Sequence, residues 1–131
     1  MEYFVKTPEE LVKSFISDYE KWNNESCANY KNDKINGMKN ATNNYQLLID
    51  KYCVSTLSPQ GVAFGSESTH SLEQEKIVES SKKGNQAIIH SQHKDIHDFV
   101  STYEYHLKVI DGCWRLTSVL YVDNDGKYEC L

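Results

Sequence analysis

The sequence predicts an α+β fold in which helices come first and antiparallel strands follow. Two observations support this prediction. Apolar residues recur at helical spacing between residues 11 and 52, and strand-like segments joined by turn signals fill the C-terminal third. Elements segregated along the chain in this way pack as helices against an antiparallel sheet. The length of 131 residues is typical of one domain, so we expect a single domain over residues 1–131.

The first helix is expected to begin at Thr7-Pro8-Glu9-Glu10. Thr7 is a good capping residue, Pro8 suits the first helical position, and Glu10 completes a capping box. An apolar stripe then predicts a helix that runs to about Cys27. The stripe consists of Leu11, Val12, Phe15, Ile16, Tyr19 and Trp22.

A second helical pattern follows an asparagine-rich stretch that reads as a loop. Its apolar positions are Ile35, Met38, Ala41 or Thr42, Tyr45, Leu48, Ile49 and Tyr52. Gly37 weakens the start of this helix because glycine is a poor helix former. Residues 56–61 contain Pro59 and Gly61 and end the pattern, and residues 62–65 then suggest a short strand.

Residues 71–83 fit two interpretations. Ser71-Leu72-Glu73-Gln74 resembles a helix start, whereas residues 77–81 can be extended. The turn signal at residues 82–85 is followed by a strand pattern over residues 86–91. We therefore favour a hairpin across this turn.

The C-terminal hairpin carries the strongest local signal. Residues 99–110 and 113–123 flank Asp111-Gly112, which favours a two-residue turn with Ile110 opposite Cys113. This register places one set of residues on the core face: Phe99, Tyr103, Tyr105, Leu107, Val109, Trp114, Leu116, Ser118, Leu120 and Val122. The opposite, solvated face is expected to carry Thr102, Glu104, His106, Lys108, Arg115, Thr117, Val119 and Tyr121. Residues 127–131 are expected to form a C-terminal tail that either pairs with a neighbouring strand or frays.

Composition excludes several function classes. The net charge is −5 and Arg115 is the only arginine, so we expect no nucleic-acid binding and, for any protein partner, a basic one. No apolar run approaches a membrane span, and Met1–Lys6 lacks the layout of a signal peptide, which favours the cytoplasm. The cysteines are expected to be reduced thiols. Without short paired spacings they predict no zinc site, and we expect no cofactor.

Several segments together resemble the nuclear transport factor 2-like fold, a cone of N-terminal helices packed in a strongly bent antiparallel sheet, also described as cystatin-like. They are residues 7–10, 87–90 and 103–107, the Gly112-Cys113-Trp114-Arg115 run that continues to Tyr121, and residues 125–127. Within that superfamily the chain is most similar to bacterial immunity proteins, which neutralise the toxins of polymorphic and contact-dependent systems.

The resemblance implies a protein that binds a cognate toxin stoichiometrically and is not an enzyme. It also leaves a homodimer open. The toxin-binding candidates are Glu104, His106, Arg115 and Tyr121 on the solvated sheet face. An acidic run supplies two more, Glu73 and Glu75, which with Glu67 and Glu79 would attract a basic, nuclease-like toxin.

Enzymes with this fold, such as ketosteroid isomerase-like members and dehydratases, offer the alternative of a small-molecule site inside the cone. Its pocket would be lined by Tyr19, Tyr45, Tyr103 and Tyr105. Such a site needs a buried carboxylate facing the substrate. Asp18 lies beside the apolar stripe, Glu104 points away, and no second carboxylate is expected in the interior. The four tyrosines are therefore interpreted as core residues.

His90, His93 and His97 suggest metal ligands. His93 and His97 have helical spacing, but residues 94–98 read as a loop, and His90 and His93 point to opposite faces of a strand. We therefore expect surface histidines without a metal.

Overall fold

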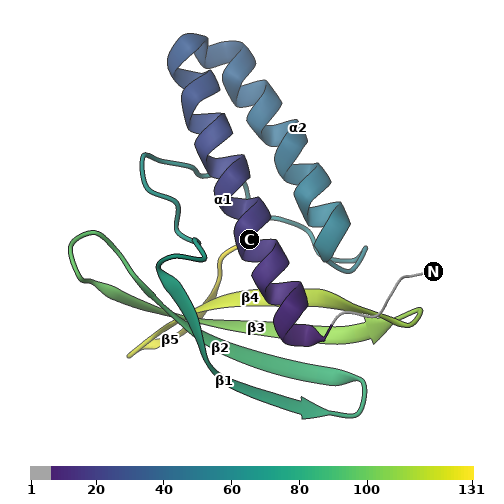
Figure 1. Cartoon of the computed structure of the whole chain (residues 1–131). Helices are drawn as coiled ribbons and strands as arrows, with labels where there is room; N and C mark the ends of the chain where they lie inside the picture. The colour runs from purple at the N-terminus through teal and green to yellow at the C-terminus, as the bar shows by residue number, and fades with distance from the viewer. Residues whose placement is uncertain (1–6) are drawn as a thin grey trace.

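A computed structural model describes residues 7–131 of the chain (Figure 1). The expectation drawn from Met1–Lys6 therefore lies outside the described residues. Two helices precede five strands: α1 (Pro8–Asn32), α2 (Lys34–Tyr52), β1 (Glu75–Lys83), β2 (Gln86–Lys94), β3 (Val100–Ile110), β4 (Cys113–Asp123) and β5 (Gly126–Glu129). The strands form one sheet in the order β1-β2-β3-β4-β5, and each neighbouring pair is antiparallel. The predicted α+β class is confirmed.

The start of α1 is confirmed in detail. The Thr7 side chain accepts from the Glu10 backbone N–H at 3.2 Å, and the Glu10 carboxylate accepts from the Thr7 backbone N–H at 2.9 Å. The helix continues to Asn32, beyond the expected end near Cys27. Its apolar stripe supplies buried side chains at Phe15, Tyr19 and Trp22, so packing of this stripe holds a helix whose last turns have weak propensity.

The two helices form a hairpin with an abrupt turn. Asp33 ends α1 and also caps α2, where its carboxylate accepts from the Asn36 N–H at 3.1 Å. Gly37 then passes so close to α1 that an added Cβ would lie 2.6 Å from the Tyr30 Cα. The glycine that weakened the helical pattern is thus required by the approach of the two helices. The indole N–H of Trp22 joins them further along by donating to the Ala41 carbonyl at 3.0 Å.

Residues 53–74 connect α2 to β1 and contain no assigned strand, so the short strand expected at residues 62–65 is wrong. The Asn23 side chain instead satisfies both backbone groups of Gly65, donating to its carbonyl at 2.9 Å and accepting from its N–H at 3.0 Å. This substitutes for strand pairing. At the start of the segment, Cys53 forms an isolated parallel bridge with Leu116 on β4.

The β1–β2 hairpin is confirmed, and so is the β3–β4 register next to the Asp111-Gly112 turn. A bulge changes the rest of β4: Leu107 pairs with Leu116 but His106 pairs with Ser118, which leaves Thr117 as an extra residue. The extra residue flips every later side chain to the other face. The face assignments after Leu116 are therefore wrong: Val119 and Tyr121 share the face of Tyr103 and Tyr105, whereas Ser118, Leu120 and Val122 lie on the opposite face.

The core lies between one face of the sheet and the helices. In Figure 1 the N-terminal part of α1 crosses the sheet, while the rest of the helical hairpin projects away from it. The fully buried aromatic and aliphatic side chains at this junction include Phe15, Ile16, Ile49, Ile89, Tyr105, Leu116 and Val119. We call this face of the sheet the inner face and the opposite one the outer face. Within residues 7–131, neither helix has the length and apolar content that a membrane span requires.

Candidate functional site

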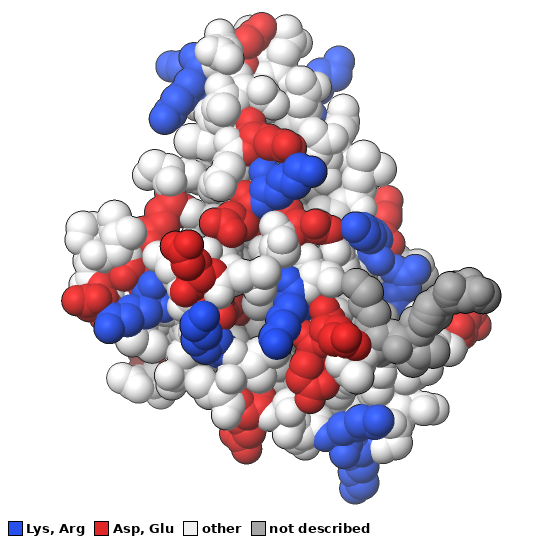
Figure 2. All heavy atoms as spheres, in the orientation of Figure 1, with Lys and Arg blue, Asp and Glu red and all other residues white. Residues whose placement is uncertain are grey.

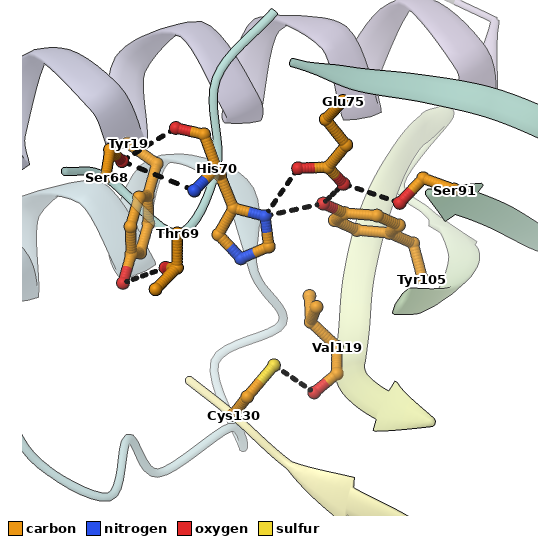
Figure 3. Close-up of polar contacts among 9 residues, drawn as sticks. All are labelled: Tyr19, Ser68, Thr69, His70, Glu75, Ser91, Tyr105, Val119 and Cys130. Atoms are coloured by element: carbon orange, nitrogen blue, oxygen red, sulfur yellow. Dashed lines mark hydrogen bonds and ion pairs between the residues drawn. The ribbon is translucent and has the colours of Figure 1, made fainter. Parts of the chain in front are cut away.

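A buried carboxylate occupies the inner face, at the first residue of β1. Glu75 accepts hydrogen bonds from the His70 Nδ1–H at 2.8 Å, from the Ser91 hydroxyl at 2.5 Å and from the Tyr105 hydroxyl (Figure 3). The Tyr105 oxygen also lies 3.0 Å from His70 Nδ1. We call these four residues the inner cluster.

The inner cluster joins segments that are distant in the sequence. His70 comes from the connection between α2 and β1, Ser91 from β2 and Tyr105 from β3. The His70 ring is tilted against the Tyr103 ring at a centroid distance of 4.5 Å and makes an edge contact with Tyr19 at 4.8 Å. The cluster thereby fixes the connection, α1 and the sheet to one another.

The electrostatics of the inner cluster favour a charged carboxylate. Burial acts to raise the pKa of Glu75, but the bonds from His70, Ser91 and Tyr105 outweigh it, so this pKa is lowered. Burial and the adjacent Glu75 charge raise the pKa of Tyr105, which keeps its proton and donates it. A general base must instead reach a substrate proton, and the Glu75 side chain is 0% exposed. The arrangement therefore suits a structural role.

Two expectations about Glu75 are wrong. It was expected on the surface with Glu73, and no second carboxylate was expected to converge in the interior; Glu75 is buried and Glu73 is exposed. A bulge at Val78 shifts the pairing of β1 with β2, so alternation in the sequence alone does not show which face Glu75 occupies. His70 was missed because its connection carries no periodic pattern. A histidine five residues before a glutamate was the available signal, and it is a weak one.

The four tyrosines of the alternative pocket are all buried. Tyr19 contacts Trp22 and Tyr45 edge-on, at centroid distances of 5.4 and 6.5 Å. Tyr105 belongs to the inner cluster. Asp18, the acid expected beside the apolar stripe, accepts from the Tyr52 hydroxyl at 2.5 Å and from Lys51 at 2.8 Å. These contacts are those of core aromatics and a partly exposed ion pair.

A second carboxylate, Glu104, lies on the outer face in the middle of β3. His106 Nε2 lies 2.6 Å from Oε1 of Glu104 and His90 Nε2 lies 2.9 Å from Oε2, while Lys127 Nζ approaches Oε2 to 3.0 Å. We call these four residues the outer cluster. Burial acts to raise the pKa of Glu104, but the bonds from His106, Lys127 and His90 outweigh it and lower this pKa to about 2.

Strand register explains the outer cluster. His90, Glu104 and Leu120 are successive cross-strand partners on β2, β3 and β4, and Lys127 follows on β5 opposite Val122. Glu104 and His106 were correctly expected to point away from the helices. The face was expected to be largely solvated, and this is wrong for Glu104, because its neighbours' side chains leave it only 4% exposed.

Two other candidates for toxin contact are engaged elsewhere. Arg115 Nη1 donates to the carbonyls of Asp50 and Lys51, at 3.0 Å each, and to that of Cys53 at 3.3 Å, so it caps the C-terminal end of α2. It lines an open hollow of about 750 Å³ between that helix end and the β3–β4 turn. Tyr121 lies on the inner face, with its ring 5.9 Å from that of Tyr103, because of the bulge at Thr117.

His90 and His93 do lie on opposite faces, as expected: His90 contacts Glu104, whereas His93 is buried on the inner face opposite Glu75. His93 is therefore not a surface histidine. Among the described residues, no three histidine, cysteine, aspartate or glutamate side chains gather as a metal site would require.

Comparison with known proteins gave one positive result. A family model described as NTF2 fold immunity protein matches residues 7–129. Searches of curated proteins and of solved structures found no match. The family match covers both helices, the connection and all five strands, in agreement with the architecture. The chain therefore belongs to the family of NTF2 fold immunity proteins.

Proposed function

We propose that this protein is a cytoplasmic immunity protein of a bacterial polymorphic toxin system. It binds one cognate toxin domain stoichiometrically and blocks it. The observation that carries this proposal is the family match over residues 7–129. An immunity family implies a toxin partner, and a cell that makes a toxin needs the neutralising protein in the compartment where the toxin is made.

A non-enzymatic mechanism is supported by the state of the buried carboxylates. Glu75 accepts from three donors and its side chain is 0% exposed, so a substrate has no access to it. Glu104 is ionised and surrounded by His90, His106 and Lys127. Neither carboxylate has the raised pKa or the approach path of a general acid or base.

The outer face supports binding because neither helix covers it. The outer cluster lies at its centre, with half-buried Ile88, Leu120 and Val122 beside it. Mixed charge around aliphatic side chains is usual for a standard interface of ~800 Å² per partner. We propose that Glu104 and His106 contribute to this surface. Glu73 is exposed and can also contact a toxin, whereas Glu75 is enclosed in the core.

Co-expression with the protein encoded immediately upstream tests the proposal. The expected result is that the neighbour alone stops growth, that this chain restores growth, and that the two elute together from a sizing column. Two controls are the chain expressed alone and the neighbour expressed with an immunity protein of a different toxin. A harmless neighbour that fails to co-elute would contradict the proposal.

A further inference from the structure

A group of exposed apolar residues lies at one end of the sheet, in and beside the β2–β3 loop. Ile96 is 71% exposed, and Phe99 and the adjoining Val100 are 59% and 49% exposed. In Figure 2 uncharged side chains form the projecting tip at the left, where Figure 1 shows this loop, and acidic side chains lie beside it. Large apolar side chains displayed together mark interaction sites more often than isolated ones do.

The loop holds these side chains in a fixed arrangement. The Asp95 carboxylate accepts from the backbone N–H groups of His97 at 2.8 Å and Phe99 at 2.9 Å. The Glu67 carboxylate, from the α2–β1 connection, accepts from the Ile96 N–H at 3.1 Å. Asp98 takes a left-handed conformation with φ 65° that closes the turn. A loop ordered before binding loses little conformational entropy when a partner docks.

A small hollow of about 130 Å³ lies beside the loop. It is lined by Glu67, Ser68, Thr69, His93, Asp95, Ser101 and Tyr103. His93 is 4% exposed, and its Nε2 has no hydrogen-bond partner among the described residues. A buried polar atom without a partner is uncommon and needs an explanation. The side chains of Glu67, Asp95 and His93 line the same hollow, with the unpaired Nε2 buried behind its wall, and two carboxylates beside an imidazole suit a cationic donor.

Charge at this end of the sheet favours the same ligand. Val122 pairs with Thr102, so the β4–β5 turn with Asp123 and Asp125 lies at the end of β3 from which the loop extends. Together with Glu67, Asp95 and Asp98 these residues outnumber the nearby Lys94 and Lys127; Lys94 lies 3.6 Å from Asp98, and Lys127 is paired with Glu104. Carboxylates around an apolar anchor attract a basic partner and speed its association.

We propose that the β2–β3 loop is the anchor for the toxin: a lysine or arginine side chain of the toxin enters the hollow, donates to His93 Nε2 and pairs with Glu67 and Asp95. Ile96 and Phe99 pack against apolar surface around that cation. This inference rests on the proposed function and adds the chemistry of the partner, a basic residue flanked by apolar ones. Buried aromatic anchors beside desolvated charges are typical of binding hot spots.

Isothermal titration of the purified chain with the upstream-encoded protein tests the apolar part. We expect Ile96→Ser and Phe99→Ser each to weaken binding by about 10-fold or more, since hot-spot truncations cost ≥ 2 kcal/mol and 1.4 kcal/mol corresponds to tenfold. Leu47→Ser is the matched control, because Leu47 is 65% exposed on α2 and far along the chain from the loop. This control should bind like the wild type.

The hollow is tested by His93→Phe, which keeps a ring and removes the unpaired nitrogen. We expect an unchanged or raised melting temperature, because an unsatisfied buried polar atom is lost, together with a roughly tenfold weaker complex. A lowered melting temperature with unchanged affinity would show that Nε2 serves the fold and would overturn the hollow's role. If the wild type binds its neighbour and all loop variants bind equally well, the inference alone is wrong. If the wild type binds nothing, the proposed function fails.

Discussion

Glu75 and Glu104 are equally buried, at 4% exposure each, yet they lie on opposite faces of one sheet and have different surroundings. Glu75 faces the helices, and its donors come from β2, β3 and the connection before β1. Glu104 faces away, and its donors come from β2, β3 and β5, with side chains 30–53% exposed. The same residue type thus ties distant segments together on one face and organises a surface on the other.

The difference shows how the fold separates stability from recognition. Two of the Glu75 donors, Ser91 and Tyr105, are neutral hydroxyls shielded from water, so this carboxylate is sensitive to the loss of any partner. The Glu104 donors are histidines and a lysine in contact with solvent, so water and salt can replace part of their effect. The inner cluster is expected to affect folding alone, and the outer cluster to affect pH response and binding.

The largest expected effect is that of Glu75→Gln. Its three partners all donate hydrogen bonds, and a glutamine places an NH₂ group against at least one of them. Breaking a buried charged network of this kind costs about 3–5 kcal/mol. Urea denaturation with Glu73→Gln as the exposed control measures the difference. If Glu75→Gln lowers the free energy of unfolding by less than ~1 kcal/mol, the role assigned to the inner cluster is contradicted.

Glu104→Gln should destabilise the protein in a pH-dependent way. The Glu104 pKa is lowered from 4.5 to about 2, so its stabilisation is present above pH ~4.5 and is lost as the pH falls toward 2. A shift of this size corresponds to at most about 3 kcal/mol, and solvent exposure of the partners reduces it to on the order of 1–2 kcal/mol. Unfolding curves of both proteins from pH 7 to pH 2 should converge at the acid end. Parallel curves would show that Glu104 ionisation is not the cause.

Tyr105→Phe removes one donor from Glu75 and leaves the ring in place. We expect the free energy of unfolding to fall by ~1–3 kcal/mol, because a buried charged acceptor loses a hydrogen bond that water cannot replace. Tyr121→Phe is the control, since Tyr121 is half-buried on the same face; we expect a change within ~0.5 kcal/mol. Chemical denaturation compares the two variants. Equal losses of unfolding free energy would assign the effect to tyrosine packing in general.

The smallest effect is expected for Lys127→Ala. Lys127 is 53% exposed, and exposed ion pairs contribute ~0.2–1 kcal/mol. The resulting loss of unfolding free energy should be smaller still in 0.5 M salt, because salt screens exposed charges. A loss above ~2 kcal/mol that salt leaves unchanged would mean that the outer cluster behaves like the inner one.

Local signals predicted most of the fold. The capping box at Thr7 and the Asp111-Gly112 turn each depend on a few adjacent residues, so sequence alone placed one helix start and one hairpin register. The errors arise where long-range contacts decide. The bulge at Thr117 reverses the face of Tyr121, and Asn23 satisfies Gly65 in place of a strand partner.

The candidate sites were harder to predict than the fold. Glu104 and His106 follow from strand alternation, so their outward direction was correctly expected. The inner cluster requires His70, Glu75 and Tyr105 to meet across 35 residues of sequence, which no local pattern reveals. Glu75 therefore looked like one member of an exposed acidic run. The hollow at His93 also depends on the connection folding over β2, and its residues carry no motif.

Stoichiometric neutralisation is tested most directly by titrating a fixed amount of the upstream-encoded toxin domain with this protein, at concentrations well above the dissociation constant. Residual toxin activity should fall linearly and reach zero at one equivalent, independently of incubation time. Complete inactivation by a small fraction of an equivalent, progressing with time, would mean that the protein acts as a catalyst and would contradict the account.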